Sequence, residues 1–271
     1  MMRQITPVVK ILLILNIALF VLSYVYSKFT GGSLNGILGL HYWTSEKFQP
    51  FQIVTHFFMH SDQFIGHVFF NMFALFMFGP HLERKLGAER FLFYYFFTAI
   101  GAAVIFLTIF HLEIQTFEER VENFKNNPTI EQFESIKDKE IGSFYQQRLR
   151  LDEFINEWLK YPESNNYKSQ AVSIVSSVLE REKDKPIVGA SGAIFGILLA
   201  FGMFFPNLTL LLLIPPIPIK AKYLVLILGV FELYSGLRFD PSNNTANFAH
   251  LGGMLFGFIL IKIWQKKGRL Y

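Results

Sequence analysis

The sequence between residues 189 and 196 is Gly189-Ala190-Ser191-Gly192-Ala193-Ile194-Phe195-Gly196, and a related stretch near the C-terminus is Asn247-Phe248-Ala249-His250-Leu251-Gly252-Gly253-Met254-Leu255-Phe256-Gly257. Each stretch is apolar except for a reactive side chain, Ser191 in the first and His250 in the second. A polar or ionisable side chain within a membrane-spanning segment is costly, so its presence indicates a function. A hydroxyl that faces an imidazole is the arrangement of a nucleophile with its general base.

Both stretches also carry small residues four positions apart, which allow two helix backbones to approach closely in a membrane. These glycine pairs are Gly192 with Gly196 and Gly253 with Gly257. His250 lies three and seven residues before the second pair, so it shares their helix face. We therefore expect the two notched faces to pack together and to bring Ser191 towards His250. Phe195, one turn after Ser191, is expected to stack on the imidazole and fix its orientation.

A purely structural interpretation of these motifs stays open. Glycine pairs are common where membrane helices pack, a serine at a helix start is an ordinary cap, and a lone buried histidine is usually structural. Either motif alone fits packing as well as chemistry, whereas the two together favour chemistry. The sequence offers no obvious carboxylate as a third member, and Asp62 and Asp240 are candidates only by their position in loops. A Ser-His dyad suffices if another group orients the imidazole.

The composition excludes an ordinary soluble domain. Of 271 residues, 52% are hydrophobic and 17% charged, 32 are phenylalanine, and the mean hydropathy is +0.34. Residues 112–186 differ from the rest, because they hold 15 of the 21 acidic and 11 of the 25 basic residues. The absence of cysteine excludes disulfides, thiolate catalysis and cysteine-based zinc sites. The overall charge of +4 is no sign of nucleic-acid binding, since the bases outside 112–186 cluster at the ends of apolar runs.

Six apolar runs are candidate membrane spans, although some are shorter than the roughly 20 residues that a helix needs to cross. They are residues 8–26, about 64–78, 91–110, 191–205, 223–237 and 248–264. We expect the second run to end at Gly79-Pro80 and the fourth at Phe205-Pro206. With six spans, the basic residues of the termini and connecting loops all fall on one side of the membrane. They are Arg3, Lys10, Arg84, Lys85, Arg90, Lys220, Lys222, Lys262, Lys266, Lys267 and Arg269. The positive-inside rule makes that side, with both termini, cytoplasmic.

The opposite side then receives residues 27–63, the hydrophilic segment 112–186 and the loop at 238–245. The aromatic content of 27–63 favours a place in the membrane interface. Apolar residues recur at helical spacing in the hydrophilic segment, which predicts a small solvated helical hairpin. They are Ile130, Phe133, Ile136, Ile141, Leu149, Phe154, Trp158 and Leu159. We thus divide the chain into residues 1–111 with three spans, an extracytoplasmic insert at 112–186, and residues 187–271 with three more.

Acyl transfer also requires donors for the developing oxyanion. His67 and Asn71 are four residues apart on the second run and so share one face. Asn71 stands among phenylalanines, where a buried amide needs a partner or water. The backbone N–H of Ser191, at a helix N-terminus, is a third candidate donor. Alternatively, Asn71 only joins two helices.

These residues resemble the rhomboid family of intramembrane serine proteases. The resemblance covers residues 1–111 and 187–271 and leaves out the insert. It rests on three separated motifs that follow one another in the family's order. In chain order they are His67-x-x-x-Asn71 followed by Gly79 and Glu83, then Gly189-x-Ser191-Gly192, then His250-x-x-Gly253-x-x-x-Gly257.

The resemblance implies an all-α bundle of six transmembrane helices with the helical insert between helices 3 and 4. It implies a serine endopeptidase that cleaves transmembrane proteins near the outer membrane face, with Ser191 as nucleophile and His250 as general base. It places His67, Asn71 and the Ser191 amide around the oxyanion, with Gly189 beside them. It implies no cofactor or metal, membrane proteins as substrates and the lipid bilayer as surroundings. The natural location is a bacterial cytoplasmic membrane, and the oligomeric state is left open.

Two other functions remain as alternatives. A catalytically silent rhomboid-like protein would bind membrane clients without cleaving them, but such relatives typically lack the serine or the histidine. A metal-dependent enzyme or transporter would use His56, His60 and His67. The chain has no HExxH motif, and Asp62 is the one acidic residue near these histidines.

Overall fold

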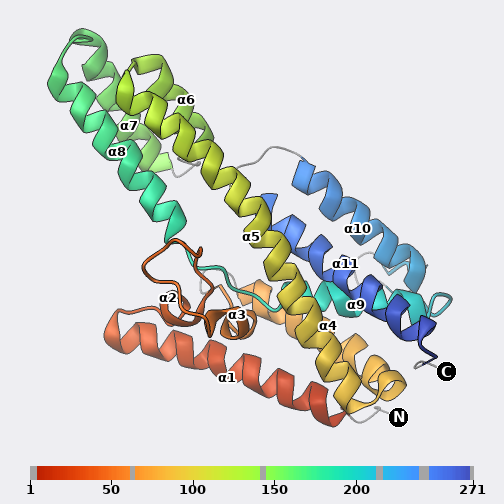
Figure 1. The fold of residues 1–271 in the computed structure, drawn as a ribbon. Helices are drawn as coiled ribbons and strands as arrows, with labels where there is room; N and C mark the ends of the chain where they lie inside the picture. The colour runs from red at the N-terminus through yellow and green to blue at the C-terminus, as the bar shows by residue number, and fades with distance from the viewer. Residues whose placement is uncertain (1–4, 62–64, 141–144, 212–215, 238–243, 269–271) are drawn as a thin grey trace.

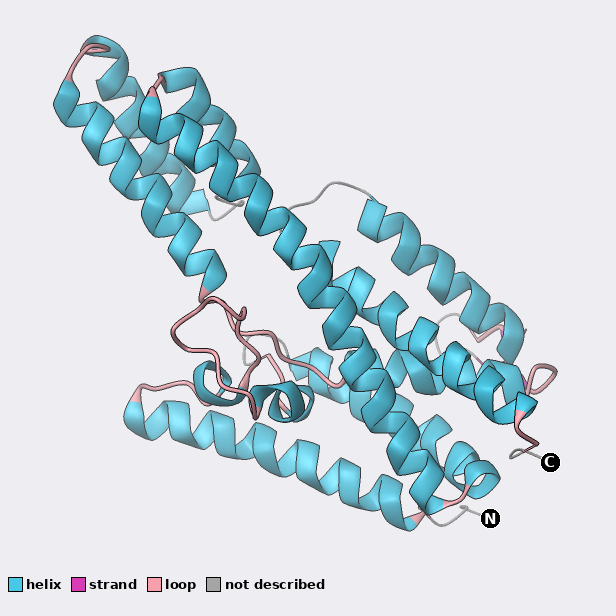
Figure 2. Ribbon diagram, in the orientation of Figure 1, coloured by secondary structure: helices cyan, strands magenta, loops and turns pink. Residues whose placement is uncertain are grey.

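The computed structural model describes residues 5–61, 65–140, 145–211, 216–237 and 244–268, and most of them are helical (Figures 1 and 2). The elements in chain order are α1 (Pro7–Thr30), α2 (Asn35–Leu38), α3 (Gln52–Thr55), η1 (His56–Phe58), α4 (Ile65–Leu86), α5 (Ala88–Asn126), α6 (Ile130–Glu140), α7 (Tyr145–Lys160), α8 (Asn165–Lys183), α9 (Ser191–Phe204), β1 (Thr209–Leu211), β2 (Pro218–Lys220), α10 (Ala221–Leu237) and α11 (Asn244–Lys266). The two strands form a short antiparallel ribbon between α9 and α10, in which Leu210 pairs with Ile219.

The chain is an integral membrane protein. Among the described residues, α1, α4, α5 and α11 are long and apolar enough to cross a membrane, while α9 is apolar but shorter. Leucine, isoleucine and aromatic side chains of α1 and α10 are exposed, as expected for faces that meet lipid. A helix stands at each of the six predicted positions, with α10 at the fifth. That all six cross the membrane remains a prediction.

The predicted end of the second run at Gly79-Pro80 is wrong, because α4 continues through Pro80 to Leu86. The reason is tertiary packing against the start of α1. A side-chain carbon on Gly79 would lie 2.7 Å from Cγ2 of Val9, so the two helices are nearly in backbone contact. The buried carboxylate of Glu83 accepts hydrogen bonds from the backbone N–H groups of Val8 (3.1 Å) and Val9 (2.9 Å). These bonds satisfy backbone N–H groups that the start of α1 would otherwise leave unpaired. Their contribution to the free energy of folding offsets the cost of Pro80 inside α4.

The third run does not end at Phe110 either, since α5 continues without a break to Asn126. Beyond the apolar run, the helix keeps one buried face at Ile114, Phe117, Val121 and Phe124. That spacing is amphipathic, so this part of α5 packs on protein rather than on lipid. The predicted boundary at residue 112 therefore falls inside a continuous helix.

The insert is more than a hairpin. Helices α6, α7 and α8 pack on the distal half of α5 around a separate apolar core, which lies away from the main bundle (Figure 1). Phe133 and Trp158 are fully buried at its centre, with ring centroids 6.0 Å apart. An ion pair of 2.6 Å between Lys137 and Asp152 joins α6 to α7. Of the predicted apolar positions, Leu159 is exposed and Ile141 lies outside the described residues.

The main core lies where α4, α5, α9 and α11 pack together. Helix α9 contacts α4, α5, α10 and α11, which explains why so much of it is buried. The start of α1 and the end of α11 lie at the same end of the bundle, and the insert lies at the other end (Figure 1). Helix α9 therefore stands inside the bundle, with Ser191 at its first position.

Candidate active site

Helices α9 and α11 touch through their backbones at the first glycine of each pair. A side-chain carbon on Gly253 would overlap the carbonyl oxygen of Gly192. A carbon on Gly192 would in turn overlap the side chain of Ala102 on α5. No other residue type fits this three-helix contact without moving a backbone. The predicted close approach of the two helices is therefore present at Gly192 and Gly253.

The second glycines, by contrast, accommodate α5 and not each other. A side-chain carbon on Gly196 would lie 2.7 Å from Cβ of Thr98, and one on Gly257 would overlap the hydroxyl of Tyr94. That hydroxyl donates a 2.7 Å hydrogen bond to the carbonyl oxygen of Gly196. Side chains of α5 thus form a wedge between α9 and α11 one turn below Ser191, and they fix the angle between these helices.

An extended segment fixes the start of α9. Ile187 pairs with Leu40 through two backbone hydrogen bonds of 2.8 and 2.9 Å. The N–H of Gly189 donates a 3.0 Å bond to the carbonyl oxygen of His56. Gly189 has a φ of +137°, a conformation that side-chain-bearing residues rarely adopt. The loop before α4 therefore sets where the chain turns into α9 and where Ser191 lies.

His250 lies against Phe195, as predicted. Their ring centroids are 4.2 Å apart and the rings are nearly parallel, at 8°. His250 and Ser191 line the same small cavity of about 70 Å³, together with Gly189 and Gly192. A hydroxyl at a helix N-terminus and an imidazole held in a fixed plane thus border one confined space, as a nucleophile and its base require.

A carboxylate that the sequence analysis missed contacts this histidine. Oε2 of Glu232, on α10, lies 3.0 Å from Nδ1 of His250. The signal for it was present, because Glu232 is the only acidic residue in the fifth apolar run, residues 223–237. The two acids considered from the sequence, Asp62 and Asp240, lie outside the described residues.

His67 lies beside the serine motif. A side-chain carbon on Gly189 would lie 3.2 Å from Cε1 and 3.5 Å from Nε2 of His67, and 3.5 Å from Oγ of Ser191. Asn71 is buried one turn further along α4, and its Nδ2 has no hydrogen-bond acceptor among the described residues. A buried amide donor without an acceptor costs about 1–3 kcal/mol, so it calls for a ligand or water as partner.

The two neighbouring histidines have structural partners. Nε2 of His60 donates to Oδ1 of Asn16 at 3.0 Å, and Nδ1 of His56 donates to the carbonyl oxygen of Gln52 at 2.8 Å. His60 also meets the ring of His67 edge-on, with centroids 5.7 Å apart. In the described part of the chain, no three His, Cys, Asp or Glu side chains are grouped as metal ligands.

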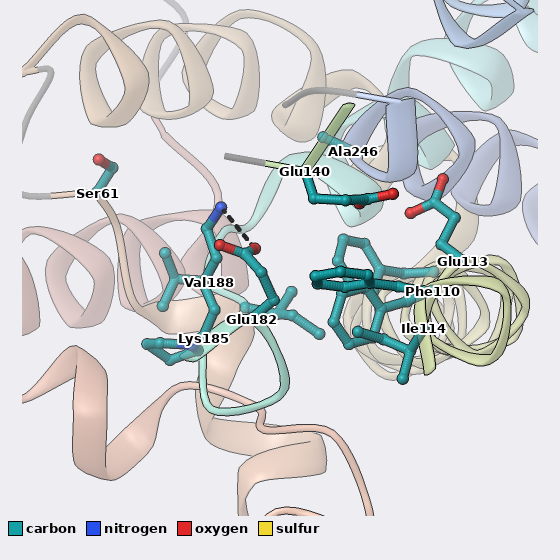
Figure 3. A pocket seen from close by; sticks show the side chains of 13 residues that line it. Ser61, Phe110, Glu113, Ile114, Glu140, Glu182, Lys185, Val188 and Ala246 are labelled. Carbon is teal, nitrogen blue, oxygen red and sulfur yellow. Dashed lines mark ion pairs between the residues drawn. The ribbon is translucent and has the colours of Figure 1, made fainter. Parts of the chain in front are cut away.

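A larger cavity of about 410 Å³ adjoins the small one on the side of the insert (Figure 3). The two share the lining residues Phe106, Ile187, Val188 and Ala246. Glutamates 113, 140 and 182 border the larger cavity, where Glu182 pairs with Lys185 at 3.7 Å. Burial raises the pKa of the Glu140 carboxyl, although the nearby Arg120 opposes this shift. A cavity with a mainly apolar lining and several charged side chains thus leads from the insert towards Ser191.

The comparison with protein families gives one match. A model described as the Rhomboid domain matches residues 47–114 and 169–267, which is more than half of the chain. The matched segments contain Ser191, His250, His67 and Asn71, whereas residues 115–168 lie outside the match. No curated protein matches the chain.

Proposed function

Because this chain belongs to the rhomboid family, we propose that it is an intramembrane serine endopeptidase that hydrolyses peptide bonds in or near transmembrane segments of other membrane proteins. One observation carries the proposal. Ser191 and His250 are 59 positions apart in sequence and lie on different helices, yet they border one small cavity, and Phe195 stacks on the imidazole. Packing alone does not require a hydroxyl and an imidazole to meet in a confined space.

The reaction follows from the roles of these groups. Oγ of Ser191 attacks the scissile carbonyl carbon while the imidazole of His250 takes its proton. The backbone N–H of Ser191, His67 and Asn71 donate hydrogen bonds to the oxyanion, and the orphaned Nδ2 of Asn71 supports this role. His250 then protonates the leaving amine, and the acyl-enzyme remains. Water, activated by the same imidazole, hydrolyses this ester and frees Ser191.

The size of the site favours particular substrates. A cavity of about 70 Å³ beside Ser191 has room for a small side chain next to the scissile bond. A peptide bond within a helix is hydrogen-bonded and shielded, so it must unwind before the serine reaches it. We therefore expect substrates with a small residue before the cleaved bond and helix-weakening residues after it.

We further propose that both termini are cytoplasmic and that Ser191 opens towards the outer face of a bacterial cytoplasmic membrane. The basic residues at the ends of the apolar runs support this orientation. The start of α1 and the end of α11 lie at one end of the bundle, in agreement with an even number of crossings (Figure 1). The proposed reaction needs no cofactor or metal and involves no nucleic acid.

The test is labelling of the detergent-solubilised protein with a fluorophosphonate probe, beside cleavage of a transmembrane reporter. We expect the wild type to be labelled and active, and Ser191→Ala and His250→Ala to be folded but neither labelled nor active. If the folded wild type is neither labelled nor active, the silent client-binding alternative is favoured. The same assay on a variant without the insert then shows whether the insert blocks the probe.

A further inference from the structure

Glu232 is a buried carboxylate on α10, a helix with many exposed apolar side chains. It is 6% exposed, whereas its neighbours Phe231 and Leu233 are 61% and 46% exposed. The other buried positions of α10 are the small or apolar residues Ala221, Val225 and Gly236. A carboxylate at such a position is costly unless a partner compensates for its lost hydration. The position of Glu232 therefore calls for a specific partner.

That partner is His250. Nδ1 of His250 and Oε2 of Glu232 are 3.0 Å apart, and neither atom has a hydrogen-bond partner among the described residues. The distance between these two atoms is that of an ion-paired carboxylate and imidazole, but the angle at the pair is not that of a hydrogen bond. Catalytic hydrogen bonds are often poorly aligned without substrate and tighten in the reacting complex.

We propose that Glu232 is a positioning residue that makes the Ser191–His250 pair a triad, an inference that rests on the proposed protease function. A carboxylate accepts hydrogen bonds and cannot donate them when ionised, so it selects the imidazole tautomer that carries its proton on Nδ1. Nε2 is then unprotonated and free to take the proton of Ser191. The same carboxylate stabilises the imidazolium that forms when Ser191 attacks.

Phe195 and Glu232 act on different motions of the ring. The stack with Phe195 fixes the ring plane, but a half-turn about the Cβ–Cγ bond returns the imidazole to this plane and exchanges its two edges. A carboxylate at Nδ1 removes that freedom and leaves one orientation and one tautomer. The dyad without Glu232 would hold the ring flat without selecting the nitrogen that faces Ser191.

The other titratable groups near His250 do not supply this function. His67, on α4, lies beside Gly189, and His56 lines the same cavity as His250. Both are imidazoles, and neither provides an anionic acceptor. Within the described part of the chain, Glu232 is the only carboxylate at ion-pair distance from His250.

The experiment compares Glu232→Gln, which keeps the size of the side chain, with Glu232→Asp, which keeps its charge. We expect Glu232→Gln to lower kcat on the transmembrane reporter about 10²-fold with KM unchanged. This is less than the roughly 10⁴-fold loss on removal of a triad carboxylate, because Phe195 still holds the ring. Glu232→Asp should recover part of kcat, because it restores the negative acceptor.

A second measurement separates positioning from stability. With ¹⁵N-labelled histidine, the His250 signals are assigned by their loss in His250→Ala. We expect one tautomer, protonated at Nδ1, in the wild type and a mixture in Glu232→Gln. The matched control is Glu83→Gln, which removes another buried carboxylate that bonds the start of α1. It should lower the thermal midpoint without changing kcat of the folded enzyme or the His250 tautomer.

The outcomes are separable from those of the proposed function. A folded Glu232→Gln with wild-type kcat and an unchanged His250 tautomer overturns the inference. The inference is also overturned if Glu83→Gln, at the same loss of thermal stability, loses as much activity as Glu232→Gln. A wild type without labelling or cleavage rejects the protease function, and the tautomer of His250 in Glu232→Gln then still decides whether Glu232 positions the ring.

Discussion

At the scale of single residues, the candidate site combines buried polar atoms that have no hydrogen-bond partner in the described part of the chain. Nδ2 of Asn71 lacks an acceptor, and Nδ1 of His250 faces only Glu232 among the described residues. A protein selected for stability alone would replace such groups with apolar ones, because each unpaired buried donor costs free energy. Under the proposed protease function, these groups would serve the charges that develop during acyl transfer.

For Asn71→Ala we expect a fall in kcat of about 10²–10³-fold, which is the loss on removal of one oxyanion donor. KM should change little, because the oxyanion forms only in the transition state. The measurement is steady-state cleavage of the transmembrane reporter, with the thermal midpoint as a check on folding. Inactivation as complete as that of Ser191→Ala, in a destabilised protein, would instead favour the role of Asn71 as a link between helices.

At the scale of elements, one three-helix contact places the two reactive side chains. Gly192 and Gly253 bring α9 and α11 into backbone contact, and the side chains of Tyr94 and Thr98 on α5 fill the space beside the second glycines. The glycines four residues apart therefore have two different partners, a facing helix and the α5 wedge. A larger residue at the first or the second glycine of a pair would tilt α11 and move His250 away from Ser191.

Gly253→Ala tests this contact. We expect a lower thermal midpoint and a large loss of kcat, because the new methyl group would overlap the Gly192 carbonyl oxygen and overpacking costs about 1–3 kcal/mol. The matched control is Gly229→Ala on α10, where the added carbon would lie 3.3 Å from the flexible end of Met254. Gly229→Ala should keep the midpoint or raise it, since alanine favours a helix. Equal effects of both variants would contradict the assignment.

A second contact between elements joins the loop before α4 to the segment that leads into Ser191. Asp184 accepts 2.6 Å hydrogen bonds from Nζ of Lys47 and Oγ of Ser45. These bonds hold the pKa of the Asp184 carboxyl below its ordinary value. The lowered pKa means that the contact stabilises the fold while Asp184 is ionised.

The pH dependence follows from that direction. Stabilisation by Asp184 is complete above the unfolded pKa of about 3.9 and is lost as the pH falls through the lower folded pKa. We expect Asp184→Asn to lower the thermal midpoint slightly at neutral pH, because an exposed pair contributes at most about 1 kcal/mol. The difference between the two proteins should vanish on acidification. A difference that persists unchanged in acid would show that Asp184 acts by packing instead.

At the scale of the whole molecule, two apolar cores share one long helix. The near half of α5 belongs to the membrane bundle, and its far half forms the insert core with α6, α7 and α8 (Figure 1). Tyr42, from the loop before α4, belongs to the insert core, so this loop contacts both parts. The insert borders the larger cavity that adjoins the one beside Ser191.

Deletion of residues 115–183, with a flexible Gly-Ser linker in their place, tests whether the insert is an accessory. We expect hydrolysis of a soluble peptide reporter to remain largely intact, because the bundle core includes no residue of the insert. The same deletion combined with Ser191→Ala gives the background. A folded but inactive deletion variant would show that the insert is needed for catalysis itself.

Local sequence patterns were enough to predict the membrane class and the helical runs, and the pairing of Ser191 with His250 as a catalytic dyad stays a prediction. Apolar length, basic flanks and glycine spacing are local properties, and each depends on residues that are close in the chain. The stack of Phe195 on His250 was also predictable, since it follows from one helical turn after Ser191. The extension of α5 left a signal too, in the spacing of Ile114, Phe117 and Val121.

Which distant groups meet depends on tertiary packing. Helix α4 continues through Pro80, and beyond it Glu83 accepts hydrogen bonds from Val8 and Val9 of another helix. Gly196 and Gly257 contact α5 rather than each other, and Glu232 reaches His250 from α10. The helical period gives the face of each residue but not the neighbour that this face meets. That neighbour depends on the packing of several helices at once, because their volumes must fill one interior without overlap.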